Sequence, residues 1–139
     1  APLLQLPYEE FVLRVLAQRY AAAGTFMTRD GMAQSLQGTW VTAYTALAMG
    51  QDDRYRGLEV MALSTQRRWE VYQASLDEPD ARARLGLRYD DVRRGAVRAA
   101  AERMPALLQG RLAERLGVTR EALLRGELTP PPSDDGGAR

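Results

Sequence analysis

The side chains with the greatest capacity for binding chemistry in this sequence are arginines, and they are concentrated in one stretch of the chain. Eleven arginines and five carboxylates lie between Arg82 and Arg125, whereas seven arginines and ten carboxylates precede Arg82. A guanidinium group can hold a phosphate or a guanine edge through two parallel hydrogen bonds. This distribution, in a chain with a net charge of only +1, favours contact with a nucleic acid.

The residue types that most enzymes use for proton transfer and nucleophilic attack are missing. The sequence contains no histidine, no cysteine and no lysine. It therefore offers no imidazole base, no thiolate and no amine for a Schiff base, and it cannot form a disulfide or the usual kind of zinc site. Because lysine is absent, arginine is also the only cation available, so its use alone is weak evidence. We expect a protein that is not an enzyme and that needs no metal ion or cofactor.

The arginines must be positioned by helices, because apolar residues recur at three- and four-residue steps along most of the chain. No segment alternates apolar and polar residues over a useful length, which argues against strands. The sequence therefore predicts an all-α fold of six to seven helices. Helices are expected over residues 8–23, 28–49, 53–76, 79–86, 90–103, 105–116 and 119–126.

The two longest expected helices each carry an apolar stripe. The stripe of the first comprises Met32, Leu36, Trp40, Ala43, Tyr44 and Leu47. The stripe of the second comprises Leu58, Met61, Thr65, Trp69, Tyr72 and Leu76. This second helix would be about 35 Å long, which favours packing against another subunit. We therefore predict a homodimer that forms along it. The residues predicted for its interface are Leu58, Met61, Trp69 and Tyr72.

The sequence QGRLAERLGVTREALLRGEL, at residues 109–128, indicates a helix, a tight turn and a second helix. Gly117 lies where the turn needs a left-handed backbone, and Thr119 lies where the next helix needs an N-cap. This stretch resembles the helix-turn-helix signature of bacterial and phage repressors. The resemblance implies that Ala113 lies where the two helices cross and that Leu123 attaches the second helix to the core.

The resemblance also implies a set of residues that contact DNA. The helix expected over residues 90–103, which Asp90 is expected to cap, adds further arginines to this set. The predicted DNA contacts are Arg93, Arg94, Arg98, Arg111, Arg115, Thr119, Arg120 and Arg125. Gly126 departs from the family pattern, which has an apolar residue there. A plain corner between two packed helices also ends in glycine and restarts at threonine, so this second interpretation stays open.

The distribution of apolar and charged residues predicts three regions. Residues 1–78 would form an N-terminal helical bundle that mediates oligomerisation, and residues 79–128 would form a basic helical region. Residues 129–139 would form an acidic tail rich in proline and glycine, with no apolar residue to bury. The sequence shows neither a run of 18 apolar residues nor a signal-peptide pattern, so we expect a cytoplasmic protein that does not enter a membrane.

These features together predict a non-enzymatic DNA-binding or regulatory protein that dimerises through its N-terminal helices. Two alternatives belong to other classes. The chain could be a helical adaptor or assembly protein whose arginines pair with acidic surfaces of other proteins. It could also be a small-ligand sensor with an aromatic pocket, for which the candidate lining residues are Trp40, Tyr44, Trp69 and Tyr72.

Overall fold

The computed structural model describes residues 28–129, which form helices joined by short loops and contain no strand. The helices are α2 (Arg29–Ala48), α3 (Asp52–Ala74), α4 (Pro79–Arg84), α5 (Tyr89–Glu102), α6 (Ala106–Leu116) and α7 (Arg120–Leu124). The predicted all-α fold is confirmed for this range. The helix expected over residues 8–23 and the tail beyond Thr129 lie outside it. Within the same range, no helix combines the length and the apolar character needed to cross a membrane.

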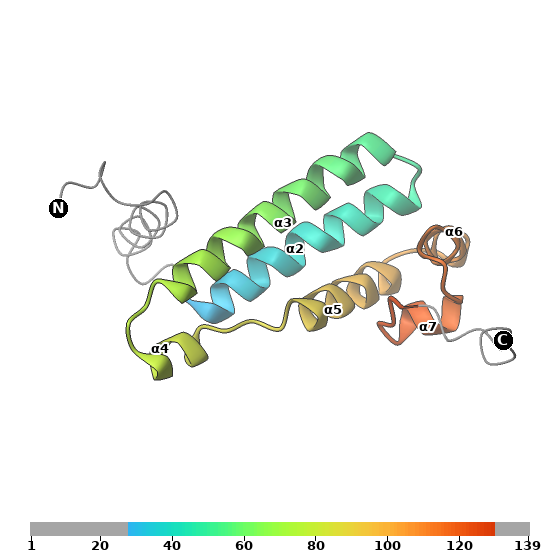
Figure 1. The fold of residues 1–139 in the computed structure, drawn as a ribbon. Coiled ribbons are helices and arrows are strands. Elements are labelled where there is room, and N and C mark those ends of the chain that lie inside the picture. Colours follow the sequence, from blue (N-terminus) through green and yellow to red (C-terminus); the bar gives the residue numbers. More distant parts are fainter. Residues whose placement is uncertain (1–27, 130–139) are drawn as a thin grey trace, which may run out of the picture.

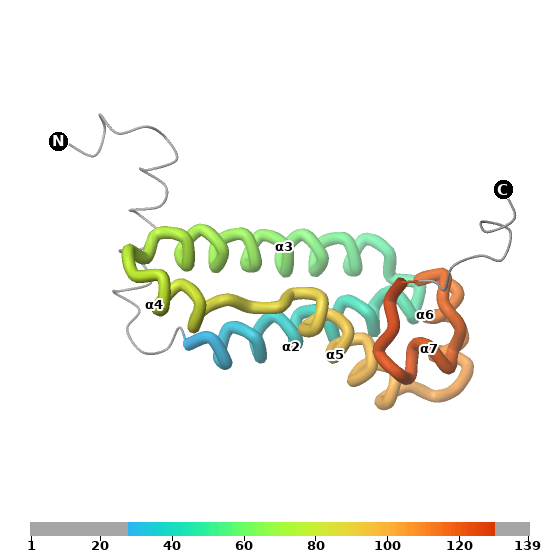
Figure 2. The backbone as a smooth tube through the Cα atoms, turned by 60° about the horizontal axis from the view of Figure 1, so that its bottom comes forward, coloured from blue at the N-terminus to red at the C-terminus, as the bar shows by residue number. Residues whose placement is uncertain are grey.

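Helices α2 and α3 form an antiparallel pair, and α5 packs along α2 (Figure 1). Helices α6 and α7 lie at the end of this pair where α2 passes into α3, whereas α4 lies at the opposite end (Figure 2). Helix α2 is the centre of the arrangement because it contacts α3, α5 and α6.

The start of α2 and its buried face follow the sequence prediction. Thr28 is the N-cap, and its Oγ1 accepts a hydrogen bond of 3.0 Å from the backbone N–H of Gly31. This bond satisfies one of the N–H groups that have no partner within the helix. All members of the predicted stripe are buried, from Met32 through Trp40 to Leu47.

The stripe predicted for α3 is wrong at Met61. The side chain of Met61 is 56% exposed, whereas Ala62 and Trp69 are the buried residues of this helix. Leu58 is half-buried and packs against the core. Ala62 lies four residues after Leu58, and its small side chain lets α2 approach α3 closely. The predicted stripe instead continued three residues after Leu58, at the larger Met61.

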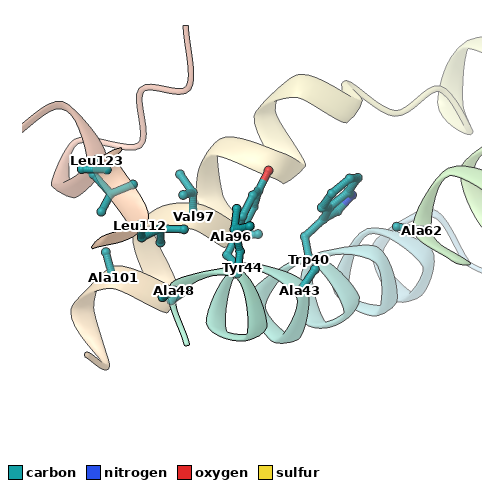
Figure 3. Close-up of a cluster of buried hydrophobic side chains, with 13 residues drawn as sticks. Trp40, Ala43, Tyr44, Ala48, Ala62, Ala96, Val97, Ala101, Leu112 and Leu123 are labelled. Atoms are coloured by element: carbon teal, nitrogen blue, oxygen red, sulfur yellow. The ribbon is translucent and has the colours of Figure 1, made fainter. Parts of the chain in front are cut away.

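The main core crosses the boundary that the sequence suggested at residue 78. It combines Trp40 and Tyr44 of α2 with Val97 of α5, Leu112 of α6 and Leu123 of α7, as Figure 3 shows. Because α2 buries one side against α3 and another against α5, residues 28–78 and 79–128 share one core. The division into an N-terminal bundle and a separate basic region does not correspond to two independent cores.

A second core cluster lies towards the α4 end of the molecule. It consists of Met32, Leu36 and Trp69, with Tyr72 packed against it. The indole N–H of Trp69 donates a hydrogen bond of 2.7 Å to the backbone oxygen of Leu85, which attaches the segment after α4 to α3. Trp69 is therefore a core residue of the protomer, and its predicted place in a subunit interface is wrong.

The aromatic side chains proposed for a ligand pocket fill the core. Trp40, Tyr44 and Trp69 each have an exposed fraction of at most 1%. The rings of Trp40 and Tyr44 stack at a centroid distance of 5.6 Å, and those of Trp69 and Tyr72 lie 5.4 Å apart. Because these rings pack against protein atoms, they leave no open wall for a small ligand, and the predicted aromatic pocket is wrong.

Tyr55 of α3 packs at the edge of the main core and carries a hydroxyl group there. Its hydroxyl donates a hydrogen bond of 2.8 Å to Oε2 of Glu59, and its ring lies 6.4 Å from that of Tyr44. The pKa of Tyr55 is raised well above its ordinary value. Burial is the larger cause, and the hydrogen bond to the Glu59 carboxylate is the next largest. The folded chain therefore holds the Tyr55 proton more tightly than the unfolded chain does.

The stability of the fold should consequently decrease at alkaline pH. The contribution of Tyr55 to the free energy of unfolding is fully present below about pH 10, the pKa of tyrosine in the unfolded chain. It is lost as the pH rises from there towards the higher pKa of Tyr55 in the folded chain. Urea unfolding between about pH 8 and about pH 11 should show this loss, and Tyr55→Phe should make it smaller. An identical loss in the variant and the natural chain would show that the Tyr55 proton has no part in it.

Candidate nucleic-acid interface

The turn between α6 and α7 has the predicted geometry. Gly117 adopts a left-handed backbone with φ of 70°, and the N–H of Val118 donates a hydrogen bond of 3.0 Å to the oxygen of Ala113. Thr119 is the N-cap of α7, and its Oγ1 accepts a hydrogen bond of 3.0 Å from the N–H of Ala122. The local signals for a helix, a turn and a second helix are therefore confirmed.

The packing of this unit also follows the pattern implied by the resemblance. Leu112, Ala113 and Leu123 are buried, and Val118 is half-buried against the same core. Helix α7 ends at Leu124 and has five residues, so it is shorter than the helix expected up to Gly126. The short α7 leaves little exposed length for reading bases.

The start of α5 differs from the prediction. Its N-cap is Arg88, which makes no side-chain capping bond, and Asp90 lies in the first turn of the helix. Asp90 therefore sits near the positive end of the helix dipole, where a carboxylate is favourable without capping the helix.

Gln109 of α6 is a site residue that the sequence reasoning missed. It is buried, and its Nε2 donates hydrogen bonds to the backbone oxygens of Ala101 at 2.7 Å and Met104 at 3.3 Å. Its Oε1 accepts a hydrogen bond of 2.8 Å from Nε of Arg120, so this predicted DNA contact is held against α6. The spacing of Gln109 three residues before Leu112 places both on one helix face and could have revealed its burial.

Three of the predicted arginines come together between α5 and the end of α7. Arg94 and Arg98 of α5 and Arg125 line one hollow of about 280 Å³, whose other lining residues are Asp91, Gly95 and Gly126. We refer to it as the arginine hollow. Gly126 has φ of +77°, and a Cβ added to it would lie 2.9 Å from the backbone oxygen of Arg94. The missing side chain at Gly126 is therefore what allows Arg125 to lie beside α5.

Each arginine of the hollow forms an ion pair with a carboxylate close to it in the sequence. The pairs are Arg94–Asp91 at 3.2 Å, Arg98–Glu102 at 3.7 Å and Arg125–Glu127 at 3.0 Å. Hydrogen bonding to the Arg125 guanidinium lowers the pKa of Glu127. All three arginine side chains are more than half exposed, at 51%, 59% and 61%. Water and salt screen such pairs, so an incoming anion can replace the carboxylates at little cost.

Arg93 has a different role from its neighbour Arg94. Its guanidinium carbon lies 4.2 Å from the ring centroid of Trp40, and its Nε donates a hydrogen bond of 3.1 Å to the hydroxyl of Tyr44. The hydroxyl of Tyr44 points towards α5 in Figure 3. Arg93 is half-buried and attaches α5 to α2, so its main contacts are structural.

The remaining predicted contacts lie outside the arginine hollow. Arg115 pairs with Asp52 of α3 at 2.8 Å, which ties α6 to the start of α3. Arg111 is exposed on α6, and the Thr119 hydroxyl is used by the helix cap. The arginine hollow therefore brings together only Arg94, Arg98 and Arg125 of the predicted set, whereas Arg93 and Arg94 line a separate hollow beside Leu116 and Leu128.

Fold and site together define an all-α protein whose residues 28–129 share one main core and present an arginine-lined hollow. No protein-family model matches the chain. No curated protein matches it, and no solved structure matches it.

Proposed function

We propose that this protein is a non-enzymatic nucleic-acid-binding protein that holds backbone phosphate in the arginine hollow. The observation that supports this most is the convergence of Arg94, Arg98 and Arg125 on one hollow from segments that are distant in the sequence. A phosphate group presents several acceptor oxygens, and guanidinium groups match them with charged, paired hydrogen bonds. An incoming phosphate would replace the carboxylates of Asp91, Glu102 and Glu127 as the partners of these arginines.

The unit formed by α6 and α7 lies next to this hollow and would supply further contacts. In helix-turn-helix proteins, phosphate contacts fix the orientation on DNA, and exposed residues of the second helix reach the base edges. The exposed residues at the start of α7 are Thr119, Arg120 and Glu121. The bond from Arg120 to Gln109 uses Nε and leaves the two terminal nitrogens of the guanidinium for a ligand.

The test is the salt dependence of duplex DNA binding by the full chain, followed by fluorescence anisotropy. One phosphate neutralised in the hollow contributes about −0.9 to the log–log slope, so raising the salt from about 50 to about 200 mM should weaken binding about 3.5-fold through this contact. The combined replacement Arg94→Gln, Arg98→Gln and Arg125→Gln should weaken binding and flatten this slope. The combined control Arg54→Gln, Arg82→Gln and Arg84→Gln removes the same charge elsewhere and should retain the slope.

A companion variant changes affinity in the opposite direction. Glu127→Gln removes the carboxylate that competes for Arg125, so DNA affinity should rise by about twofold to fivefold. Glu78→Gln removes an equal charge at the start of α4 and should have a smaller effect. No complex at about 50 mM salt, or equal slopes for the hollow and control triple variants, would refute the proposal.

A second candidate function, that of an assembly protein, is favoured by a separate observation. Val60, Met61 and Leu63 on α3 are exposed by 65%, 56% and 45%, respectively. Clustered apolar side chains on a surface often mark a place where another protein binds. None of the three lines the arginine hollow, so the two candidate functions use different surfaces and can be tested separately.

A further inference from the structure

Three large apolar residues of α3 are exposed within one helical turn, one on the outward side of the helix and one on each flank of it. We define this outer patch as Val60, Met61 and Leu63. Most large apolar side chains of the described helices are buried or packed against one of the core clusters, so this local exposure is unusual within residues 28–129. Covering the patch would remove apolar surface from water, which is a favourable contribution to association.

Small and charged residues extend the face on which Val60 lies. Asp53, Gly57, Val60, Ser64 and Arg67 follow one another at steps of four, three, four and three, which places them along one side of α3. No atom lies within 4 Å of the position that a Cβ of Gly57 would occupy. The surface next to Val60 is therefore low enough for the side chain of a second helix to enter.

The charges on this face match those of a second copy of the same face when the two α3 helices run in opposite directions. Asp53 and Arg67 are each seven residues from Val60, so reversal about Val60 exchanges their positions. Each Asp53 would then lie opposite Arg67 of the second copy. A parallel arrangement would instead place like charges together. Self-complementarity of this kind is the property of an interface on a twofold axis.

We propose that a second copy of this chain docks on this face, with the two α3 helices antiparallel and the twofold axis at Val60. Val60 of each copy packs against Val60 of the other on the axis, the missing side chain at Gly57 lets the two helices approach closely, and the two Asp53–Arg67 pairs close the ends. Within the protomer, Arg67 also pairs with Glu70 at 3.5 Å, but its side chain is 75% exposed and free to reach outwards. The inference does not depend on the arginine hollow or on nucleic-acid binding.

The first test is the oligomeric state of the full chain by sedimentation velocity from about 1 to about 300 µM, without DNA. We expect a monomer–dimer equilibrium in this range because the apolar patch is small. Val60→Glu and Gly57→Leu should each leave a monomer, the first by burying a charge and the second by holding the two helices apart with a side chain on the contact face. Circular dichroism and a thermal melt establish that both variants remain folded.

Charge reversal tests the antiparallel register. Asp53→Arg alone and Arg67→Asp alone should each weaken the dimer by about twofold to thirtyfold, because each change affects both symmetry-related pairs. The double variant Asp53→Arg/Arg67→Asp should restore the dimer to within about twofold of the natural chain, since the pairs re-form with opposite sign. Failure of the double variant to recover overturns the proposed register.

Methionine oxidation by peroxide identifies the covered surface and contains its own control. Met61 and Met49 are exposed to nearly the same extent, 56% and 54%, but Met49 lies at the corner between α2 and α3. Oxidation of Met61 should slow as the protein concentration rises, while that of Met49 should stay constant. A chain that remains monomeric throughout, or a dimer in which Met61 is not protected, overturns the inference and leaves the proposed nucleic-acid binding intact.

Discussion

Replacing Trp40 with alanine is expected to lower the free energy of unfolding by about 3–5 kcal/mol. Trp40 is only 1% exposed and lies in the main core, where its ring stacks on Tyr44 at 5.6 Å. The alanine variant would lose the stabilisation that comes from burying the indole ring. It would also contain a cavity that the surrounding helices can fill only in part. The Arg93 guanidinium would also lose the ring that it covers at 4.2 Å.

Urea unfolding followed by circular dichroism measures this effect without relying on tryptophan fluorescence. Trp40→Phe is the matched control, because it keeps an aromatic ring beneath Arg93 and removes less volume. It should therefore cost clearly less than Trp40→Ala. A loss below about 1 kcal/mol for Trp40→Ala would contradict the central position of this residue in the core.

Replacing Gly126 with alanine is expected to cost about 2–4 kcal/mol and to weaken DNA binding as well. Gly126 has φ of +77°, a backbone conformation that L-residues adopt at a cost. The added Cβ would also lie 2.9 Å from the backbone oxygen of Arg94, which belongs to α5 and cannot move independently. The end of α7 would have to shift away from α5, and Arg125 would move away from the arginine hollow.

Gly50 provides the control for this variant. It has φ of +73°, but no atom lies within 4 Å of the position of an added Cβ. Gly50→Ala should therefore cost only the backbone strain, about 1–2 kcal/mol, and leave DNA binding unchanged. Equal losses of stability at Gly50 and Gly126 would mean that the close approach of Gly126 to α5 is unimportant.

Several features that depend on neighbours in the sequence were predicted correctly, although Asp90 does not cap α5 and α7 ends before Gly126. Thr28 and Thr119 cap helices, and Gly117 takes the left-handed turn position. Each of these structures is stabilised by hydrogen bonds among residues within about five positions of one another, so the local sequence contains the required information. The stripe of α2 was predictable for a related reason, because the helix is covered on more than one side and most of its apolar residues are buried.

The candidate site could be predicted only in outline. The sequence indicated the region in which cations are concentrated, but Arg93 and Arg94 are consecutive and still have different environments. Arg93 lies over Trp40, and Arg94 lines the hollow, because successive residues of a helix point about 100° apart. Gln109 was missed because its partners in the backbone and Arg120 come together only when α5, α6 and α7 pack.

The sequence by itself therefore determined the helices within residues 28–129, the caps at Thr28 and Thr119, the α6–α7 turn and the concentration of arginines around the candidate site. Only the tertiary structure decided that Ala62 rather than Met61 is buried, and that Arg94, Arg98 and Arg125 share one hollow. The physical reason is the range of the interactions. Helices and turns form through contacts between near neighbours, whereas the face that a helix buries and the side chains that meet depend on which distant helix packs against it.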